Sequence, residues 1–190
     1  LLVIGFLILI QLNFEAIILG IVITPLIALY PLAKRFFILP QFILALTYNW
    51  GCFIGWAALG SNIPFSSICI LYLSLIFWTL AYDTIYATQD EKEDKNLNLY
   101  SSTLLFGSKK VIFLNIMIIT KYCFIIFYGS SLDFGFIFNI LVLTISIINL
   151  IDLNIIWKNK PENASSYFSR NNYYGISLLF SIIIGSHFNV

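Results

Sequence analysis

Long apolar runs separated by short polar connections make up most of this chain. A transmembrane helix needs about 20 mostly apolar residues, because the hydrocarbon core of a bilayer is about 30 Å thick. The expected fold is therefore an all-α integral membrane protein, a multi-pass helical bundle built as a single domain over residues 1–190. We predict seven membrane spans, the first of them partial, at residues 1–13, 15–31, 41–60, 64–88, 109–129, 133–153 and 172–189.

The connections between these spans alternate in charge. Lysine and arginine occur in residues 32–40, 89–110 and 154–171, whereas the other connections contain neither. With seven spans these three connections lie on the same side, so nine of the ten basic residues share one face and the tenth, Lys121, lies inside a span. Loops rich in lysine and arginine remain in the cytoplasm. We therefore expect the basic face to be cytoplasmic.

The composition supports a membrane protein, with 60% hydrophobic and only 10% charged residues, far from the average soluble domain. The net charge of +1 gives no indication of nucleic-acid binding, and we expect no nucleic-acid partner. Cys52, Cys69 and Cys123 lie in apolar runs without metal-ligand or disulfide spacing, and we predict that they are packing residues. Because the chain starts at Leu1 and its first apolar run ends by Ile10, we interpret it as a fragment cut inside a membrane helix.

A column of three carboxylates follows the apolar run of residues 64–82. Asp90 and Asp94 are four residues apart and share a face if the helix continues, and Asp83 lies nearly two turns earlier on the same stripe. Carboxylates at a membrane boundary are costly to desolvate, so such a cluster suggests a functional role. Mg²⁺ is usually bound through one or two carboxylates plus substrate phosphates. We therefore predict that Asp83, Asp90 and Asp94 are catalytic, metal-binding residues.

Lys34 and Arg35 follow an apolar span on the same predicted side as these carboxylates. Each could simply anchor its span by the positive-inside rule. The planar fork of arginine also matches phosphate oxygens, and lysine acts as a point charge toward them. Cations that face acidic metal ligands suit an anionic substrate bridged by Mg²⁺. We therefore predict that Lys34 and Arg35 bind a diphosphate.

The carboxylates belong to a longer pattern, Asp83-xx-Tyr86-Ala87-xx-Asp90-xxx-Asp94, and three other sequence words accompany it. These are YPLAKR at residues 30–35, STLLFG at 102–107 and NNYYG at 171–175. The aspartate pattern resembles the second aspartate-rich motif of the UbiA prenyltransferases. The other three words resemble that family's basic YPxxKR segment, its STxxLFG segment and its NNYxG segment, respectively. A lone DxxxD would be weak evidence, but the four words cover most of the chain. Within that family they are most similar to the 4-hydroxybenzoate polyprenyltransferases of ubiquinone biosynthesis.

The resemblance implies a nine-helix bundle with an active site open to the cytoplasm and, laterally, to membrane lipid. It implies the inner membrane of a bacterium, or of a mitochondrion in a eukaryote. The implied reaction is Mg²⁺-dependent transfer of a polyprenyl group from polyprenyl diphosphate to a ring carbon of 4-hydroxybenzoate. Carried over by position, Asp90 and Asp94 would hold Mg²⁺ and the diphosphate, and Asp83 would support that site. Arg35 and Lys34 would bind the diphosphate.

One part of the family's pattern has no counterpart in residues 1–190: the first aspartate-rich motif, NxxxDxxxD on an early helix. The only acidic residue before Asp83 is Glu15, which the charge pattern places on the opposite face. The seven predicted spans would correspond to the family's third to ninth helices. We therefore expect an N-terminally truncated domain that holds half of the metal site, inserts into the membrane and is inactive by itself.

Several aromatic residues are predicted to line the reaction pocket: Tyr82, Tyr86 and Trp50, together with Trp56 and Tyr48. Cation–π attraction to these rings would favour a developing allylic cation. For each ring, a place in an interfacial belt or in helix packing is the alternative.

Three other interpretations stay open. The acceptor could instead be homogentisate, a naphthoate, haem or a lipid alcohol. The chain could be a non-catalytic truncated remnant. A cation transporter is favoured least, because the carboxylates crowd one membrane boundary and no inverted repeat is evident.

Overall fold

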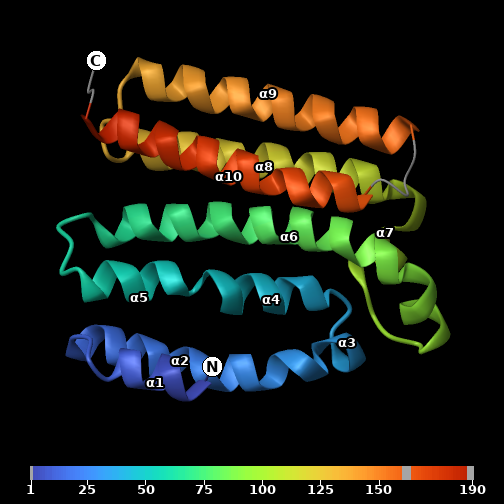
Figure 1. The fold of residues 1–190 in the computed structure, drawn as a ribbon, viewed down its shortest axis with the longest axis horizontal. Coiled ribbons are helices and arrows are strands. Elements are labelled where there is room, and N and C mark those ends of the chain that lie inside the picture. Colours follow the sequence, from blue (N-terminus) through green and yellow to red (C-terminus); the bar gives the residue numbers. More distant parts are fainter. Residues whose placement is uncertain (1, 160–163, 188–190) are drawn as a thin grey trace.

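The structure is a computed structural model that describes residues 2–159 and 164–187, and every regular element in these ranges is a helix. The long helices lie side by side, with α2 at one edge of the bundle, α9 at the other and α6 in the middle (Figure 1). The elements in chain order are α1 (Leu2–Leu9), α2 (Phe14–Leu29), η1 (Tyr30–Leu32), α3 (Ala33–Phe36), α4 (Pro40–Asn49), α5 (Gly51–Ala58), α6 (Phe65–Asn96), α7 (Ser102–Phe106), η2 (Gly107–Lys109), α8 (Lys110–Ser130), α9 (Phe136–Asn159) and α10 (Ala164–His187).

Helix α6 is the centre of the bundle, because it packs against α4, α5, α7, α8 and α10. Its two sides bury different clusters of apolar side chains. Leu80 packs with Ala45 of α4 in one cluster. Ile85 packs with Leu114 of α8 in the other. Helix α6 is therefore held in place by contacts on two of its sides.

Four segments of the described residues are long and apolar enough to cross a membrane: Phe14–Phe36, Phe65–Asn96, Ser102–Ser130 and Phe136–Ile155. They coincide with four of the predicted spans. The other predicted spans correspond to the short helix α1, to the pair α4 and α5, and to α10. The prediction of an all-α, multi-pass membrane bundle is confirmed.

Helix α6 is longer than the predicted span, since it runs for 32 residues. At about 1.5 Å per residue it measures about 48 Å, well beyond the roughly 30 Å of a hydrocarbon core. The extra turns contain Asp90 and Asp94, and the helix ends before Asn98, which has a φ of 52°. The helix therefore continues past the membrane span, as the predicted column of carboxylates requires.

The predicted span at 41–60 is interrupted, because α4 ends at Asn49 and α5 begins at Gly51. Two local features explain the break. Gly51 is a poor helix former. The side-chain amide of Asn49 donates back to the carbonyl of Ala45 and across to that of Leu75 on α6. The polar group is thus satisfied inside an apolar bundle, at the cost of a continuous helix.

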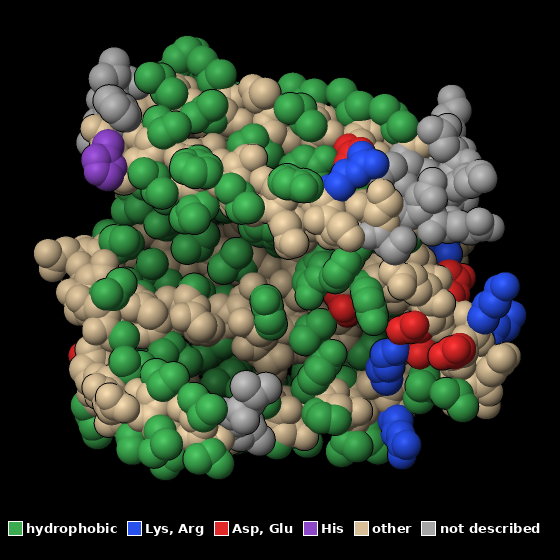
Figure 2. Space-filling model, viewed as in Figure 1, with side chains coloured by type: hydrophobic (Ala, Val, Ile, Leu, Met, Phe, Trp, Pro, Cys, Tyr) green, Lys and Arg blue, Asp and Glu red, His purple; other side chains and the backbone are tan. Residues whose placement is uncertain are grey.

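Charged side chains gather at one end of the bundle, around α3, α7 and the last turns of α6, and apolar side chains cover most of the face in view (Figure 2). At the opposite end, the side chain of Asn13 donates a hydrogen bond to the carbonyl of Ala57. Of the predicted basic residues, Lys160 and the side chain of Lys158 lie outside the described part. The placement of the others agrees with a single basic face.

The orientation of this face can be tested by labelling. A cysteine at Asn96, in a background without Cys52, Cys69 and Cys123, should react with a membrane-impermeant maleimide in inside-out vesicles but not in intact bacterial cells. The reason is that Asn96 ends α6 on the basic side, which the positive-inside rule predicts to be cytoplasmic. A cysteine at Asn62, exposed at the other end of the bundle, is the matched control and should show the reverse pattern. Labelling of the Asn96 position from outside would contradict the orientation.

Candidate functional site

The three predicted carboxylates lie along one side of α6 but at different depths. Asp83 and Asp90 are partly buried, and Asp94 is only 3% exposed. At about 1.5 Å per residue, Asp83 and Asp94 are about 16 Å apart along the helix axis. Consistent with this spacing, the described residues contain no group of three or more His, Cys, Asp or Glu side chains that could hold a metal ion. The column is therefore an extended stripe, with Asp94 at its buried end.

Asp94 is paired with a cation from a distant part of the chain. The Lys34 Nζ donates to both carboxylate oxygens of Asp94, at 2.9 Å to Oδ1 and 3.1 Å to Oδ2. The Asp94 side chain is 5% exposed and the Lys34 side chain 41% exposed. A buried carboxylate without such a partner would be strongly destabilising. Two residues predicted separately, one for metal and one for diphosphate, are thus in direct contact.

The segment that carries Lys34 is held by the loop after α6. The backbone N–H of Tyr100 donates to the carbonyl of Lys34 at 2.8 Å. The backbone N–H of Ser102 donates to the side chain of Gln41 at 3.1 Å, and the hydroxyl of Thr84 donates to that of Ser102 at 2.8 Å. The loop after α6 therefore fixes the backbone at Lys34 through Tyr100, and Ser102 attaches the next segment to Gln41 of α4 and Thr84 of α6.

A cavity of about 130 Å³ lies beside the Lys34–Asp94 pair, and Lys34, Asp83 and Gln41 are among the residues that line it. Asp83 thus lies close to Lys34, on the side away from Asp94 along α6. Over residues 2–159 and 164–187, neither Asp90 nor Arg35 forms a side-chain hydrogen bond or ion pair with another side chain. Arg35 is exposed on α3. The structure brings together three of the five predicted charged residues and leaves these two available to a ligand.

These side chains fit Mg²⁺ when a phosphate accompanies it. Carboxylate oxygens are the hard ligands that Mg²⁺ prefers. The position beside Asp94 already accommodates one cation, the Lys34 ammonium. Because Mg²⁺ in proteins commonly has one or two carboxylate ligands and fills its other positions with water or phosphate oxygens, Asp90 and Asp94 suit an ion that arrives with a diphosphate.

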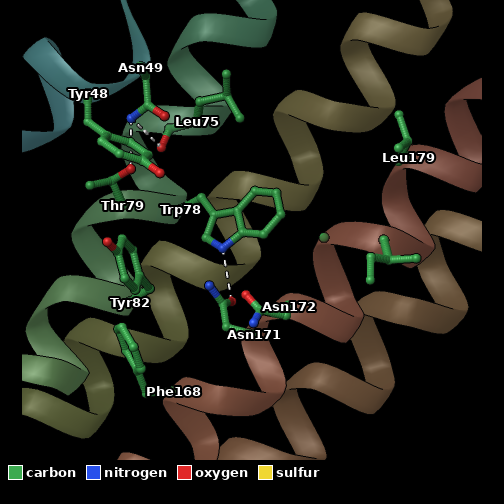
Figure 3. Close-up of a pocket in the computed structure, with 12 residues that line it drawn as sticks. Tyr48, Asn49, Leu75, Trp78, Thr79, Tyr82, Phe168, Asn171, Asn172 and Leu179 are labelled. Atoms are coloured by element: carbon green, nitrogen blue, oxygen red, sulfur yellow. Dashed lines mark hydrogen bonds between the residues drawn. The ribbon is translucent and has the colours of Figure 1, made fainter. Parts of the chain in front are cut away.

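A larger cavity of about 700 Å³ lies between α4, α6 and α10 (Figure 3). Its volume falls within the usual range for small-molecule sites, which are mostly apolar with a few polar groups. Its polar lining residues are Tyr48, Asn49, Thr79, Tyr82, Asn171 and Asn172, and its other lining residues are Leu75, Trp78, Phe168, Gly175, Ile176 and Leu179.

Polar side chains in this cavity connect the three helices. Asn49 of α4 donates to the hydroxyl of Thr79 on α6 at 2.7 Å. The indole N–H of Trp78 on α6 donates to Asn171 Oδ1 on α10 at 2.9 Å, as Figure 3 shows. Asn172 adds a second amide beside Asn171. The wall is therefore a fixed frame that presents amide and hydroxyl groups to an apolar space.

The predicted aromatic residues divide between the cavity and the packing core. Tyr82 and Tyr48 line the cavity. Tyr82 stacks on Phe168 with 5.2 Å between ring centroids, and Tyr86, which is 44% exposed, packs against the same ring at 5.3 Å. Along α6, Tyr82 directly precedes Asp83, and Tyr86 lies one turn before Asp90.

The structure corrects the prediction for Trp50. Its indole N–H donates to the carbonyl of Leu19 at 3.0 Å, and its ring packs edge-on against Phe53 and Tyr72. Trp50 lies at the break between α4 and α5 and is directed toward α2, so it belongs to helix packing. Trp56 of α5 likewise donates to a backbone carbonyl, that of Ile63 in the loop before α6.

Sequence reasoning missed most of the large cavity. Asn49, Thr79 and Asn171 were not predicted as site residues, although the first two are polar side chains within apolar runs. Such residues in membrane helices usually face the bundle interior and mark functional positions. That signal could have identified them.

The Lys34–Asp94 pair predicts a measurable coupling. Lys34→Met should lower the free energy of unfolding by about 1–3 kcal/mol, because it leaves a buried carboxylate without a cation. Asp94→Asn should cost less in the Lys34→Met background than alone. A double-mutant cycle by denaturant unfolding in detergent would measure this coupling, with Lys95→Met, an exposed lysine one residue away, as the control. Additive effects of the two changes would contradict the pairing.

Comparisons with known proteins find relatives over most of this chain. A 4-hydroxybenzoate octaprenyltransferase of Francisella tularensis subsp. novicida is 33% identical over 181 residues, which cover 95% of this chain and 63% of that protein. A mitochondrial 4-hydroxybenzoate polyprenyltransferase of Drosophila melanogaster is 40% identical over 111 residues, covering 58% of this chain and 28% of that protein. The chain thus spans about 63% of the length of the bacterial relative.

A solved structure, described as concerning the biosynthesis of digeranylgeranylglyceryl phosphate synthase in membranes, shares the fold. Its TM-score is 0.72 at 19% identity, and the match covers 97% of this chain and 66% of that one. At this identity the likeness speaks for the fold alone. The model of the UbiA prenyltransferase family matches residues 1–179. The chain belongs to the UbiA prenyltransferase family.

Proposed function

We propose that this protein is part of a membrane-embedded aromatic prenyltransferase that moves a polyprenyl group from polyprenyl diphosphate to 4-hydroxybenzoate. The observation that carries the proposal is the arrangement on α6. A buried carboxylate paired with a lysine lies at the charged end of this helix, and a cavity of about 700 Å³ opens along its membrane-embedded part. An amphiphilic substrate with a charged head and a long apolar chain matches this division.

At the charged end, Lys34 and Arg35 would bind the diphosphate, and Asp90 and Asp94 would hold the Mg²⁺ that accompanies it. The metal would neutralise charge on the departing diphosphate. Arg35 is exposed and without a partner among the described side chains, so its guanidinium is available to phosphate oxygens. Asp83 would keep Lys34 oriented, because both residues line the same small cavity.

In the membrane-embedded part, the cavity would hold the acceptor and exclude water. Cleavage of the allylic carbon–oxygen bond leaves a cation, which the ring carbon ortho to the phenol hydroxyl attacks before losing its proton. Water in the site would compete with that carbon, and apolar walls reduce its access. The ring of Tyr82 lines the cavity and stacks on Phe168, against which Tyr86 also packs, and cation–π attraction to these tyrosines would favour the developing charge.

The choice of acceptor is supported by the relatives, whose names specify 4-hydroxybenzoate. Ubiquinone biosynthesis is the corresponding pathway. We assign the charged end to the cytoplasmic side of a bacterial inner membrane, or to the inner membrane of a mitochondrion. The support is the gathering of basic side chains at one end of the bundle.

We further propose that turnover requires carboxylates beyond those in residues 1–190. The family's first aspartate-rich motif would face Asp90 and Asp94 across the cavity, and this sequence contains no NxxxDxxxD pattern. Departure of a diphosphate is easiest when preorganised positive charge surrounds it. With one set of metal ligands, part of the negative charge on the departing diphosphate would not be neutralised.

The reaction can be tested in membranes that contain the product of the whole reading frame. Incubation with radiolabelled 4-hydroxybenzoate and a polyprenyl diphosphate should give a lipid-soluble product, and EDTA should abolish it because the carboxylates need a metal to meet the diphosphate. Membranes without the protein are the control. Undiminished product in EDTA would refute the metal assignment, and no product with any aromatic acceptor would refute the enzyme.

Substitutions in the same membranes should separate site residues from surface. Asp90→Ala, Asp94→Ala and Arg35→Ala should each reduce turnover by at least about 100-fold, since each removes a charge that meets the metal or the diphosphate. Glu93→Ala, exposed on the same turn as Asp94, is the matched control and should change turnover less than about twofold. Protein levels are measured in parallel. Equal losses in all four variants would show an effect on expression and not on chemistry.

A further inference from the structure

Trp78 occupies a distinctive place on α6. It lies one turn before Tyr82 and lines the large cavity. Its indole extends from α6 toward α10, as Figure 3 shows. The sequence alone suggests no role for it beyond membrane-like packing.

Two residues of α10 hold this indole. Asn171 Oδ1 accepts the indole N–H at 2.9 Å. Gly175, one turn further along α10, leaves room for the ring. A Cβ atom at Gly175 would lie 3.1 Å and 3.4 Å from two carbons of the six-membered ring of Trp78. Both residues belong to the NNYYG segment at 171–175. Its first asparagine binds the N–H edge of the Trp78 indole, and its glycine leaves space for the six-membered ring.

A third contact comes from α8. The Lys121 Nζ lies 4.6 Å from the centroid of the Trp78 ring and 4.1 Å from that of Tyr122. Lys121 is 1% exposed and lies midway along a membrane span. Burying a lysine at this depth in a membrane costs free energy, and such residues usually have a functional role. Contact with two aromatic faces offsets part of that cost and restrains the orientation of both rings.

We propose that Trp78 is the wall against which the ring of the aromatic acceptor packs, and that Asn171, Gly175 and Lys121 are positioning residues that hold the indole in place. This inference rests on the proposed function and deepens it. The cavity offers a planar apolar face at Trp78 and an amide and a hydroxyl nearby, at Asn172 and Tyr48. A small planar acid with a phenol group requires such a combination. Hydrogen bonding and close packing of the indole reduce the ordering that acceptor binding must supply.

Binding without turnover gives the first test. The whole protein, in lipid nanodiscs without polyprenyl diphosphate, is equilibrated with radiolabelled 4-hydroxybenzoate. Trp78→Leu should weaken binding about threefold to tenfold, the range expected when an aromatic stacking partner is lost. Asn171→Leu and Lys121→Met should weaken it in the same direction, and Asn171→Asp, which retains an acceptor for the indole N–H, should restore most of the affinity. Asn115→Leu, an asparagine on α8 bonded to Asn154 of α9, is the matched control.

Fluorescence reports on the indole itself. A variant with Trp50, Trp56 and Trp157 changed to Phe keeps Trp78 as the single tryptophan of residues 1–190, and any tryptophan outside them is changed to Phe as well. Saturating 4-hydroxybenzoate should change its emission, and Asn171→Leu should shift the emission of the free protein. These readouts depend on the position of the ring and would not move if Asn171 served only to stabilise the fold.

Kinetics separates this inference from the proposed function. Trp78→Leu should raise KM for the acceptor about threefold to tenfold and leave KM for polyprenyl diphosphate within about twofold. Prenyl transfer to 4-hydroxybenzoate with an unchanged acceptor KM in Trp78→Leu would overturn the assignment of Trp78 and leave the proposed function standing. If a different aromatic acid is the acceptor, the proposed acceptor is wrong, and a raised KM for that acid in Trp78→Leu would still support the wall. Absence of binding and transfer with every aromatic acid tested would overturn both.

Discussion

The site depends on how a carboxylate at the edge of a membrane is compensated. Asp94 is nearly inaccessible, and its two oxygens accept hydrogen bonds from Lys34, which comes from the bend between α2 and α4. Such a pair requires α6 to extend past the hydrocarbon core and the bend to reach it, and the loop after α6 holds the bend through the Tyr100 N–H, which donates to the carbonyl of Lys34. The same contact also defines a place for positive charge, which is what a diphosphate and its metal need. Structural stability and the proposed binding of an anionic substrate would thus draw on one interaction.

Much of this arrangement follows from simple rules applied to the sequence. Apolar run length predicts the helices, because the bilayer leaves unpaired backbone groups no other partner. The distribution of lysine and arginine predicts a common charged end, and helical spacing predicts that Asp83, Asp90 and Asp94 share a side of α6. These inferences succeed because each depends on one element at a time. Helical spacing alone does not predict a complete metal site. Because of the rise of the helix, the three carboxylates on this stripe are too far apart to enclose a metal ion by themselves.

Features that depend on pairs of distant elements were not predictable in the same way. The interruption of the 41–60 span arises from Asn49, whose amide is satisfied by Leu75 and Thr79 of α6. Trp50 then lies at the resulting break and packs toward α2, although its type and position in the sequence suited a pocket wall equally well. A tryptophan in an apolar run carries no information on which neighbour its N–H will find. Only the relative rotation of the helices decides that, and it is set by packing that one sequence does not display.

Helix α6 joins the two parts of the site in a single rigid element. Trp78 and Tyr82 line the cavity, and Asp90 and Asp94 follow on the next turns of the same helix. Between Tyr82 and Asp90 the helix rises by about 12 Å, which would set the spacing between the proposed acceptor site in the cavity and the proposed diphosphate site at the charged end. Positioning of two reactants contributes most when their separation is fixed before they bind. Contacts with α4, α8 and α10 on both sides keep α6 from bending. The packing of α6 is remote from any reacting atom, but by keeping the helix straight it would keep the two proposed binding sites at a fixed separation.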